Sequence, residues 1–271
     1  MKPIEKLPEP ESTLSIEDLV GWRREGCSLA VLGCPIGHSI SPSIHNAALS
    51  EMVLSDSRFE DWRYFRFEIP AERLQESLGL FASSGFRGLN LTIPHKVQAL
   101  DYIDSIDSEA TAIGAVNTLV FSEDGKCDGF NTDGHGLERA LADDFGFSLE
   151  GASVILLGAG GAARAAATRF LSSGCSELWV GNRSSKRLDE LFDVLSPEGD
   201  QRLEGFALDE IPLNLPNEEG VLIVNATSLG LHREDELPFD LSTFSNAAIV
   251  YDMIYNPMET SFLQSARALG M

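Results

Sequence analysis

The chain has 271 residues, with 42 acidic and 20 basic side chains and a formal net charge of −22. So acidic a surface disfavours nucleic acids and anionic membranes as partners. The length and a hydrophobic fraction of 43% suffice to bury two moderate cores or one large one. Residues 1–15 lack the apolar core of a signal peptide and are expected to form a loose N-terminal extension, and no later run is long enough to span a bilayer.

The cysteines indicate a reducing compartment. Cys27, Cys34, Cys127 and Cys175 show no Cys-x-x-Cys spacing and no histidines at metal-ligand offsets. We therefore expect reduced thiols, no bound metal and a cytoplasmic location.

The first half of the chain alternates strand-like and helix-like segments. Its patterns predict strands at 28–33, 64–69, 86–93 and 114–121, and helices at 42–48 and 71–84. Ser41 directly precedes Pro42, which is the N-cap position of a helix that has proline as its first residue. Capping alone would explain Ser41, but Ser39 and Ser41 together would also bind a carboxylate beside that helix terminus.

Further polar residues gather where the strand 86–93 ends. Asn90 and Thr92 are two positions apart, so their side chains are expected on one face of the strand. Lys96 follows in the first turn of a helix that begins at Pro94. Such a lysine is most often a solvated surface charge, although a partly desolvated lysine can transfer protons near neutral pH. Asp133 precedes a helix predicted from about residue 135 to 145, and an N-cap role alone would explain it.

The segment 153–170 predicts a strand, a tight turn and a helix. Gly158 and Gly160 permit a sharp turn and close approach of a ligand, and small Ala163 lets the helix pack on the strand. The amide groups at the start of such a helix favour a pyrophosphate. This pattern is typical of a dinucleotide-binding domain.

A second strand, 177–182, ends about twenty residues later, where an NAD-binding domain usually has an acidic residue against the ribose. This chain has Asn182 there, followed by the basic residues Arg183, Lys186 and Arg187. A guanidinium binds a 2′-phosphate that a carboxylate would repel, so we predict NADP rather than NAD. The alternative is a solvated first helical turn, which is less favoured because helix N-termini prefer acidic residues.

Strands at 221–225 and 247–252 and a last helix at 260–269 complete the alternation, which indicates α/β architecture with parallel sheets. We expect two domains. Residues 1–131, completed by 255–271, form an α/β substrate-binding domain, and residues 132–254 form a doubly wound, Rossmann-type NADP-binding domain.

Taken together, these motifs resemble the shikimate dehydrogenase family. The resemblance rests on several segments in the family's order: Gly33–Asn46, Asn90–Lys96, Gly114–Thr118, Asn131–Gly134, Gly158–Gly161, Asn182–Ser184, Asn225–Ser228 and Tyr251–Tyr255. It implies an oxidoreductase of the shikimate pathway, which serves aromatic amino-acid biosynthesis. The implied reaction is reversible hydride transfer between C3 of shikimate and NADP, with 3-dehydroshikimate as the oxidised partner.

The resemblance also implies roles for individual residues. It implies that Lys96 is the acid/base at the 3-hydroxyl and that Asp133 is its carboxylate partner. The implied substrate-binding residues are Ser39, Ser41 and Tyr255 at the carboxylate and Asn90, Thr92 and Asn117 around the ring hydroxyls. The implied cofactor-binding residues are Gly158, Ala159, Gly160, Gly161 and Ala162 at the pyrophosphate, Asn182, Arg183, Ser184 and Arg187 at the ribose phosphate, and Thr227 and Met253 near the nicotinamide.

One departure from the family pattern concerns the end of the chain. Family members usually continue past this point with a glycine- and methionine-containing turn and a helix that carries a substrate-binding glutamine, whereas this sequence stops at Met271. Two alternatives stay open: a quinate/shikimate dehydrogenase that accepts NAD, and a non-catalytic relative that binds NADP or shikimate. The protein is expected to be a monomer or a homodimer.

Overall fold

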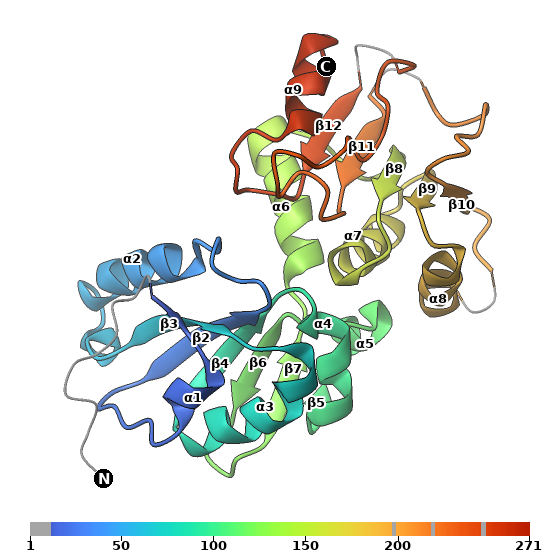
Figure 1. Cartoon of the computed structure of the whole chain (residues 1–271). Coiled ribbons are helices and arrows are strands. Elements are labelled where there is room, and N and C mark those ends of the chain that lie inside the picture. Colours follow the sequence, from blue (N-terminus) through green and yellow to red (C-terminus); the bar gives the residue numbers. More distant parts are fainter. Residues whose placement is uncertain (1–11, 197–198, 218–219, 245–247) are drawn as a thin grey trace. The chain divides into compact units, whose positions relative to one another are not determined.

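The computed structural model describes residues 12–196, 199–217, 220–244 and 248–271, and contacts divide the chain into two units, Met1–Asn131 and Thr132–Met271 (Figure 1). Each unit has its own sheet and its own buried clusters. Across these described ranges, no helix combines the length and apolarity needed to cross a bilayer.

The first unit is built on a seven-stranded sheet. The strand order is β1 (Thr13–Leu14), β3 (Arg63–Glu68), β2 (Ser28–Gly33), β4 (Phe86–Leu91), β6 (Thr118–Phe121), β7 (Cys127–Phe130) and β5 (Ser105–Ile106). Strands β1, β3, β2 and β4 are parallel, while β6 runs antiparallel to both β4 and β7. The sheet of this unit, expected to be parallel, is therefore mixed: the short turn at Asp124–Gly125 joins β6 and β7 as an antiparallel hairpin.

Two expected boundaries also differ in this unit. The strand expected at 114–121 begins at Thr118, because α5 (Ser108–Ile113) precedes it and ends at Gly114, whose φ is 65°. The expected loose extension is partly ordered, since Thr13 and Leu14 pair with β3 and a short helix, α1 (Ile16–Leu19), follows. Residues 1–11 of that extension lie outside the described residues.

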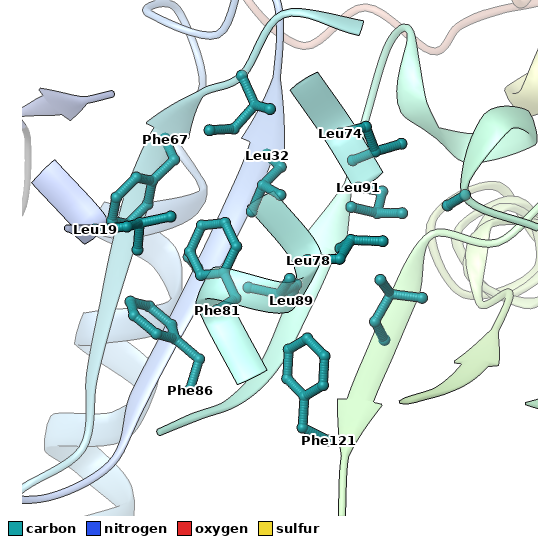
Figure 2. Packing of buried hydrophobic residues seen from close by; sticks show 14 of the residues in the cluster. Leu19, Leu32, Phe67, Leu74, Leu78, Phe81, Phe86, Leu89, Leu91 and Phe121 are labelled. Carbon is teal, nitrogen blue, oxygen red and sulfur yellow. The ribbon is translucent and has the colours of Figure 1, made fainter. Parts of the chain in front are cut away.

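Helices cover both faces of the first sheet. Besides α1 and α5 they are α2 (Ser41–Val53), α3 (Leu74–Ser83), α4 (His95–Gln98) and the 3-10 turns η1 (Ser57–Phe59), η2 (Ala71–Arg73) and η3 (Ala99–Tyr102). One face is packed by α3, whose Leu74, Leu78 and Phe81 recur at helical spacing and are buried against strand residues (Figure 2). The Phe81 ring lies edge-on to Phe86, with centroids 4.8 Å apart. The other face receives α2.

The second unit is a five-stranded, fully parallel sheet. Its order is β10 (Leu203–Ala207), β9 (Glu177–Asn182), β8 (Ser153–Leu157), β11 (Leu222–Asn225) and β12 (Ile249–Asp252). The helices are α6 (Asp133–Phe145), α7 (Gly161–Ser172), α8 (Ser185–Leu195) and α9 (Ser261–Ala268). The first strand in chain order, β8, lies in the middle, so the winding direction reverses between β8 and β11, as in doubly wound folds. Strand β10 was not predicted from the sequence.

The last helix packs in the second unit and does not complete the first, contrary to the expectation from the sequence. Phe262 and Ala266 of α9 are buried in a cluster with Ile155 and Ile223 of the second sheet. The N-cap of α9, Thr260, donates a 2.6 Å hydrogen bond to Asp252 at the end of β12. The short connection between β12 and α9 therefore keeps this helix beside its own sheet.

Candidate active site and cofactor site

The predicted carboxylate-binding serines lie in the loop that leaves β2. That loop is packed closely on the loop that leaves β4: a Cβ added at Gly33 would lie 2.6 Å from Cγ2 of Thr92. The backbone amide of Thr92 also donates to the Leu32 carbonyl at 2.9 Å. Because β2 and β4 are parallel neighbours, their loops meet at one edge of the sheet.

Ser39 and Ser41 lie together, as predicted. Ser39 is buried, and its hydroxyl donates to Oγ of Ser41 at 3.1 Å and accepts from the Ser41 amide at 3.3 Å. Ser41 is the first residue of α2 and not its N-cap, which is Ile40 and makes no side-chain capping bond. Its hydroxyl is thus not used for capping, so the alternative explanation of Ser41 is wrong.

Two charged residues of β3 support this loop, and sequence reasoning missed both. Nη1 of Arg66, a nearly buried arginine, donates to the Ser39 carbonyl at 2.7 Å. Glu68 accepts from the Ile36 amide at 3.2 Å. The sequence contained a signal for them. Residues 66 and 68 are two positions apart in the predicted strand, so their side chains lie on the same face, and both are charged.

The amides of Asn90 and Asn117 belong to one hydrogen-bond network. The Asn90 side chain accepts from the Tyr64 hydroxyl at 2.7 Å and donates to Oγ1 of Thr118 at 3.0 Å. Thr118 in turn donates to Oδ1 of Asn117 at 2.9 Å. Thr92, predicted to share a face of the strand with Asn90, lies just beyond the end of β4 and is half-buried.

Lys96 is half-buried on the short helix α4, one residue after the fully buried His95. Its carbonyl accepts from the Val116 amide at 2.8 Å, which ties α4 to the segment that leads into Asn117. Burial lowers the pKa of His95, although the nearby Ile69 carbonyl opposes this shift. Neither ring nitrogen of His95 makes a hydrogen bond of ordinary geometry with a described residue, and a buried imidazole without such partners favours its uncharged form.

The remaining predicted substrate-side residues lie in the second unit. Asp133 is half-buried and is the first residue of α6; Thr132 is the N-cap and makes no side-chain capping bond. The N-cap explanation of Asp133 is therefore wrong. Tyr255 follows β12, and half of its surface is exposed.

The glycine turn lies at the point where the winding of the second sheet reverses. Gly158 has φ of 113°, and a Cβ there would lie 2.9 Å from the Ala226 carbonyl oxygen. The turn after β8 is thus packed against the turn after β11, and ligands of doubly wound sheets bind at this place. Gly160 is exposed at the start of α7, and a Cβ there would meet no described atom within 4 Å. Gly161, Ala162 and buried Ala163 follow in the first turn, and Ala159 is buried.

The predicted ribose-phosphate residues lie at the end of β9 and the start of α8. Asn182 ends β9 and donates to the Ser184 carbonyl at 3.0 Å, and Ser184 caps α8 by accepting from the Arg187 amide at 3.4 Å. Arg183 and Arg187 are exposed, and neither forms an ion pair with any residue that the structure describes. Lys186, between them, lies 3.7 Å from Glu190. Two guanidinium groups without carboxylate partners in so acidic a protein fit a phosphate.

Thr227 and Met253 belong to the loops that leave β11 and β12. Thr227 donates to Oδ1 of buried Asn225 at 2.7 Å and accepts from the Leu229 amide at 3.1 Å. The Met253 amide donates to the Asn225 carbonyl at 3.0 Å. Asn225 also donates to Asp252 at 3.0 Å, and burial raises the pKa of this carboxyl. Asn225 therefore holds the two loops together.

This fold and these two clusters define a class of protein. A doubly wound sheet with a glycine turn at its reversal point binds dinucleotides, and the first unit brings hydroxyl, amide and lysine side chains to one sheet edge. Such a chain is a two-domain, dinucleotide-dependent oxidoreductase.

Comparisons with known proteins identify the family. The family model for the shikimate dehydrogenase substrate binding domain matches residues 31–119, and the model for shikimate / quinate 5-dehydrogenase matches residues 140–234. A shikimate dehydrogenase (NADP(+)) of Moorella thermoacetica is 39% identical over 243 residues, which cover 89% of this chain and 80% of that protein. The chain belongs to the shikimate dehydrogenase family.

Solved structures agree with this assignment. Shikimate 5-dehydrogenase from Thermus thermophilus, in complex with NADP(H) and shikimate, superimposes with a TM-score of 0.75 at 36% identity, covering 90% of this chain and 85% of that one. Shikimate 5-dehydrogenase from Listeria monocytogenes, in complex with shikimate and NAD, has a TM-score of 0.75 at 27% identity, covering 90% and 84%.

Proposed function

We propose that this protein is an NADP-dependent shikimate dehydrogenase, which reversibly interconverts 3-dehydroshikimate and shikimate on the route to aromatic amino acids. Family membership and the activity of the named relatives support this. The observation that carries the proposal is the placement of five polar side chains near one edge of the first sheet, where β2 and β4 end and the antiparallel β6 begins. These side chains are Ser39, Ser41, Asn90, Asn117 and Lys96. These types of side chain suit a carboxylate, hydroxyl groups and a proton transfer.

In this proposal Lys96 handles the proton of the reacting 3-hydroxyl. Oxidation of an alcohol leaves a proton to remove as the hydride departs, and reduction requires one to be returned. The hydride acceptor and donor is the nicotinamide of NADP. Asp133 is the carboxylate partner that orients the ammonium of Lys96 and favours its charged form after it has taken up the proton.

The other proposed contacts follow from the chemistry of each group. Ser39, Ser41 and Tyr255 donate hydrogen bonds to the substrate carboxylate. Asn90, Thr92 and Asn117 bind the ring hydroxyls.

On the cofactor side, Gly158 to Ala162 bind the pyrophosphate through backbone amides at the start of α7. Asn182, Arg183, Ser184 and Arg187 bind the adenosine ribose and its 2′-phosphate. Thr227 and Met253 lie by the nicotinamide.

The proposed partners are small molecules only, in a cytoplasmic protein that is a monomer or a homodimer. Formal net charge of −22 opposes binding to nucleic acid or to an anionic membrane.

The test is the appearance of reduced-nicotinamide absorbance when the protein is mixed with shikimate and, separately, NADP or NAD. Turnover that favours NADP is expected. Turnover that favours NAD, or quinate over shikimate, would support a quinate/shikimate dehydrogenase instead. Binding of NADP and shikimate without turnover would identify a non-catalytic relative.

A further inference from the structure

Asn90 has a feature that its expected role does not explain: every polar atom of its amide has a protein partner. Nδ2 donates to Oγ1 of Thr118 at 3.0 Å and to the Asn117 carbonyl at 3.3 Å, and Oδ1 accepts from the Tyr64 hydroxyl at 2.7 Å. An amide nitrogen has two hydrogens and an amide oxygen has two lone pairs. Both hydrogens are therefore used, and one lone pair of Oδ1 is left.

The partners also fix which way round the amide lies. The Asn117 carbonyl can only accept, so the nitrogen of Asn90 must face it. The oxygen then faces Tyr64, whose hydroxyl must donate. The Thr118 hydroxyl accepts a hydrogen bond from Asn90 and donates its own to Oδ1 of Asn117, 2.9 Å away. The network has a single consistent direction of donation, which runs from Tyr64 and Asn90 toward Asn117.

Tyr64 is held in place to do this. Its side chain is 2% exposed, and its backbone amide and carbonyl each bond the Asn46 side chain of α2 at 2.9 Å. The ring is stacked on His45 with centroids 4.1 Å apart and planes within 5° of each other. Packing and stacking thus leave the phenol with one geometry relative to Asn90.

We propose that Tyr64 is a positioning residue for substrate recognition, which locks the Asn90 amide so that it offers only an acceptor to a substrate hydroxyl. The inference rests on the proposed function, in which Asn90 contacts the ring hydroxyls, and it adds the direction of that hydrogen bond. A ring hydroxyl of shikimate donates to the remaining lone pair of Oδ1. An amide free to rotate by 180° about its Cβ–Cγ bond would present its NH₂ group to the substrate for part of the time and would bind the hydroxyl less well.

The test compares Tyr64→Phe with the wild-type protein in steady-state kinetics. The substitution keeps the ring and its stacking but removes the hydroxyl. We expect KM for shikimate to rise about three- to tenfold, the value of one neutral hydrogen bond, with kcat changed by less than about twofold. KM for NADP should not change, because the glycine turn lies in the other unit. Tyr102→Phe is the matched control. It removes the hydroxyl of a half-buried tyrosine in the same unit, which accepts a hydrogen bond from Gln98 at 3.5 Å, and it should leave both constants unchanged.

A double-variant cycle separates positioning from simple packing. In an Asn90→Ala background, Tyr64→Phe should raise KM no further, because nothing is left to orient. An unchanged KM in Tyr64→Phe, or the same rise in both backgrounds, would overturn the inference while leaving the proposed function intact. If Tyr64→Phe fails to fold, Thr118→Val removes the contact on the other side of the amide and should raise KM in the same way; an unchanged KM there would overturn the inference too. A wild-type protein that neither binds nor turns over shikimate would overturn both proposals.

Discussion

The preference for NADP should be removable by two substitutions at the start of α8. Arg183 and Arg187 are exposed cations in and beside the first turn of this helix, where the macrodipole disfavours positive charge. Neither has a carboxylate partner among the described residues. We expect Arg183→Ala and Arg187→Ala to weaken NADP binding and to spare NAD, which lacks the 2′-phosphate.

The magnitude follows from the exposure of these groups. A charge-assisted hydrogen bond contributes about 1.5–3 kcal/mol, but solvent screens an exposed pair, so about 1–2 kcal/mol for each arginine is appropriate. Each single variant should therefore lose about five- to thirtyfold in NADP affinity, and the double variant on the order of a hundredfold. The selectivity should also fall as salt is raised, since both contacts are solvent-exposed.

The assay is titration of each variant with NADP and with NAD, followed by kcat/KM for both cofactors. Lys186→Ala is the matched control, because it removes one positive charge from the same helical turn. Lys186 is 85% exposed and lies beside Glu190, so its loss should change NADP affinity by less than about threefold. Thermal unfolding of the arginine variants should show no loss of stability, since removal of a cation from a helix N-terminus is neutral or favourable.

An equal loss of NADP and NAD affinity in the arginine variants would refute this reasoning. It would mean that the guanidinium groups contact a part shared by both cofactors, or that they support the fold. If Lys186→Ala lost as much NADP affinity as Arg183→Ala, the effect would come from the net positive charge of this helical turn and not from specific arginine contacts.

Three further predictions follow from individual residues. Lys96→Ala should lower kcat about 10²–10⁴-fold with little change in NADP affinity, measured by steady-state kinetics. Equal losses of kcat and NADP affinity would mean that Lys96 supports the fold or contacts the cofactor instead. Gly158→Ala should destabilise the second unit, because the φ of Gly158 is 113° and the new Cβ would lie 2.9 Å from the Ala226 oxygen. Gly160→Ala should keep the wild-type melting temperature and weaken only cofactor binding. Equal melting temperatures of the two variants would contradict this. Burial lowers the pKa of His95 below its ordinary 6.5, so the unfolded state binds more protons than the folded state as the pH falls through that value, and the folded state loses stability on the acid side. His95→Leu should reduce this loss of stability between about pH 7.5 and about pH 5.5, measured by urea unfolding. An unchanged dependence of the unfolding free energy on pH would rule out His95 as its source.

The sequence by itself determined many of the local elements and the family. The spacing of Leu74, Leu78 and Phe81 specifies a helix with one apolar face, because the period of the α-helix places all three on one side. The glycines at 158 and 160 and the alternation of strands and helices around them specify a dinucleotide-binding unit. The sequence alone predicted that Ser39 and Ser41 lie together, because residues two positions apart beside the start of a helix are necessarily close in space. Each of these signals depends on neighbours within a few positions in the chain.

Only the tertiary structure decided which distant segments meet. The antiparallel placement of β6 and β7, the packing of α9 on its own sheet, and the contacts of Tyr64 with Asn90 and of Arg66 with Ser39 join residues far apart in sequence. An amphipathic helix or an alternating strand shows which face it buries but not the surface that covers it. The direction in which Asn90 donates and accepts is a property of partners assembled from separate strands, and no local pattern contains it.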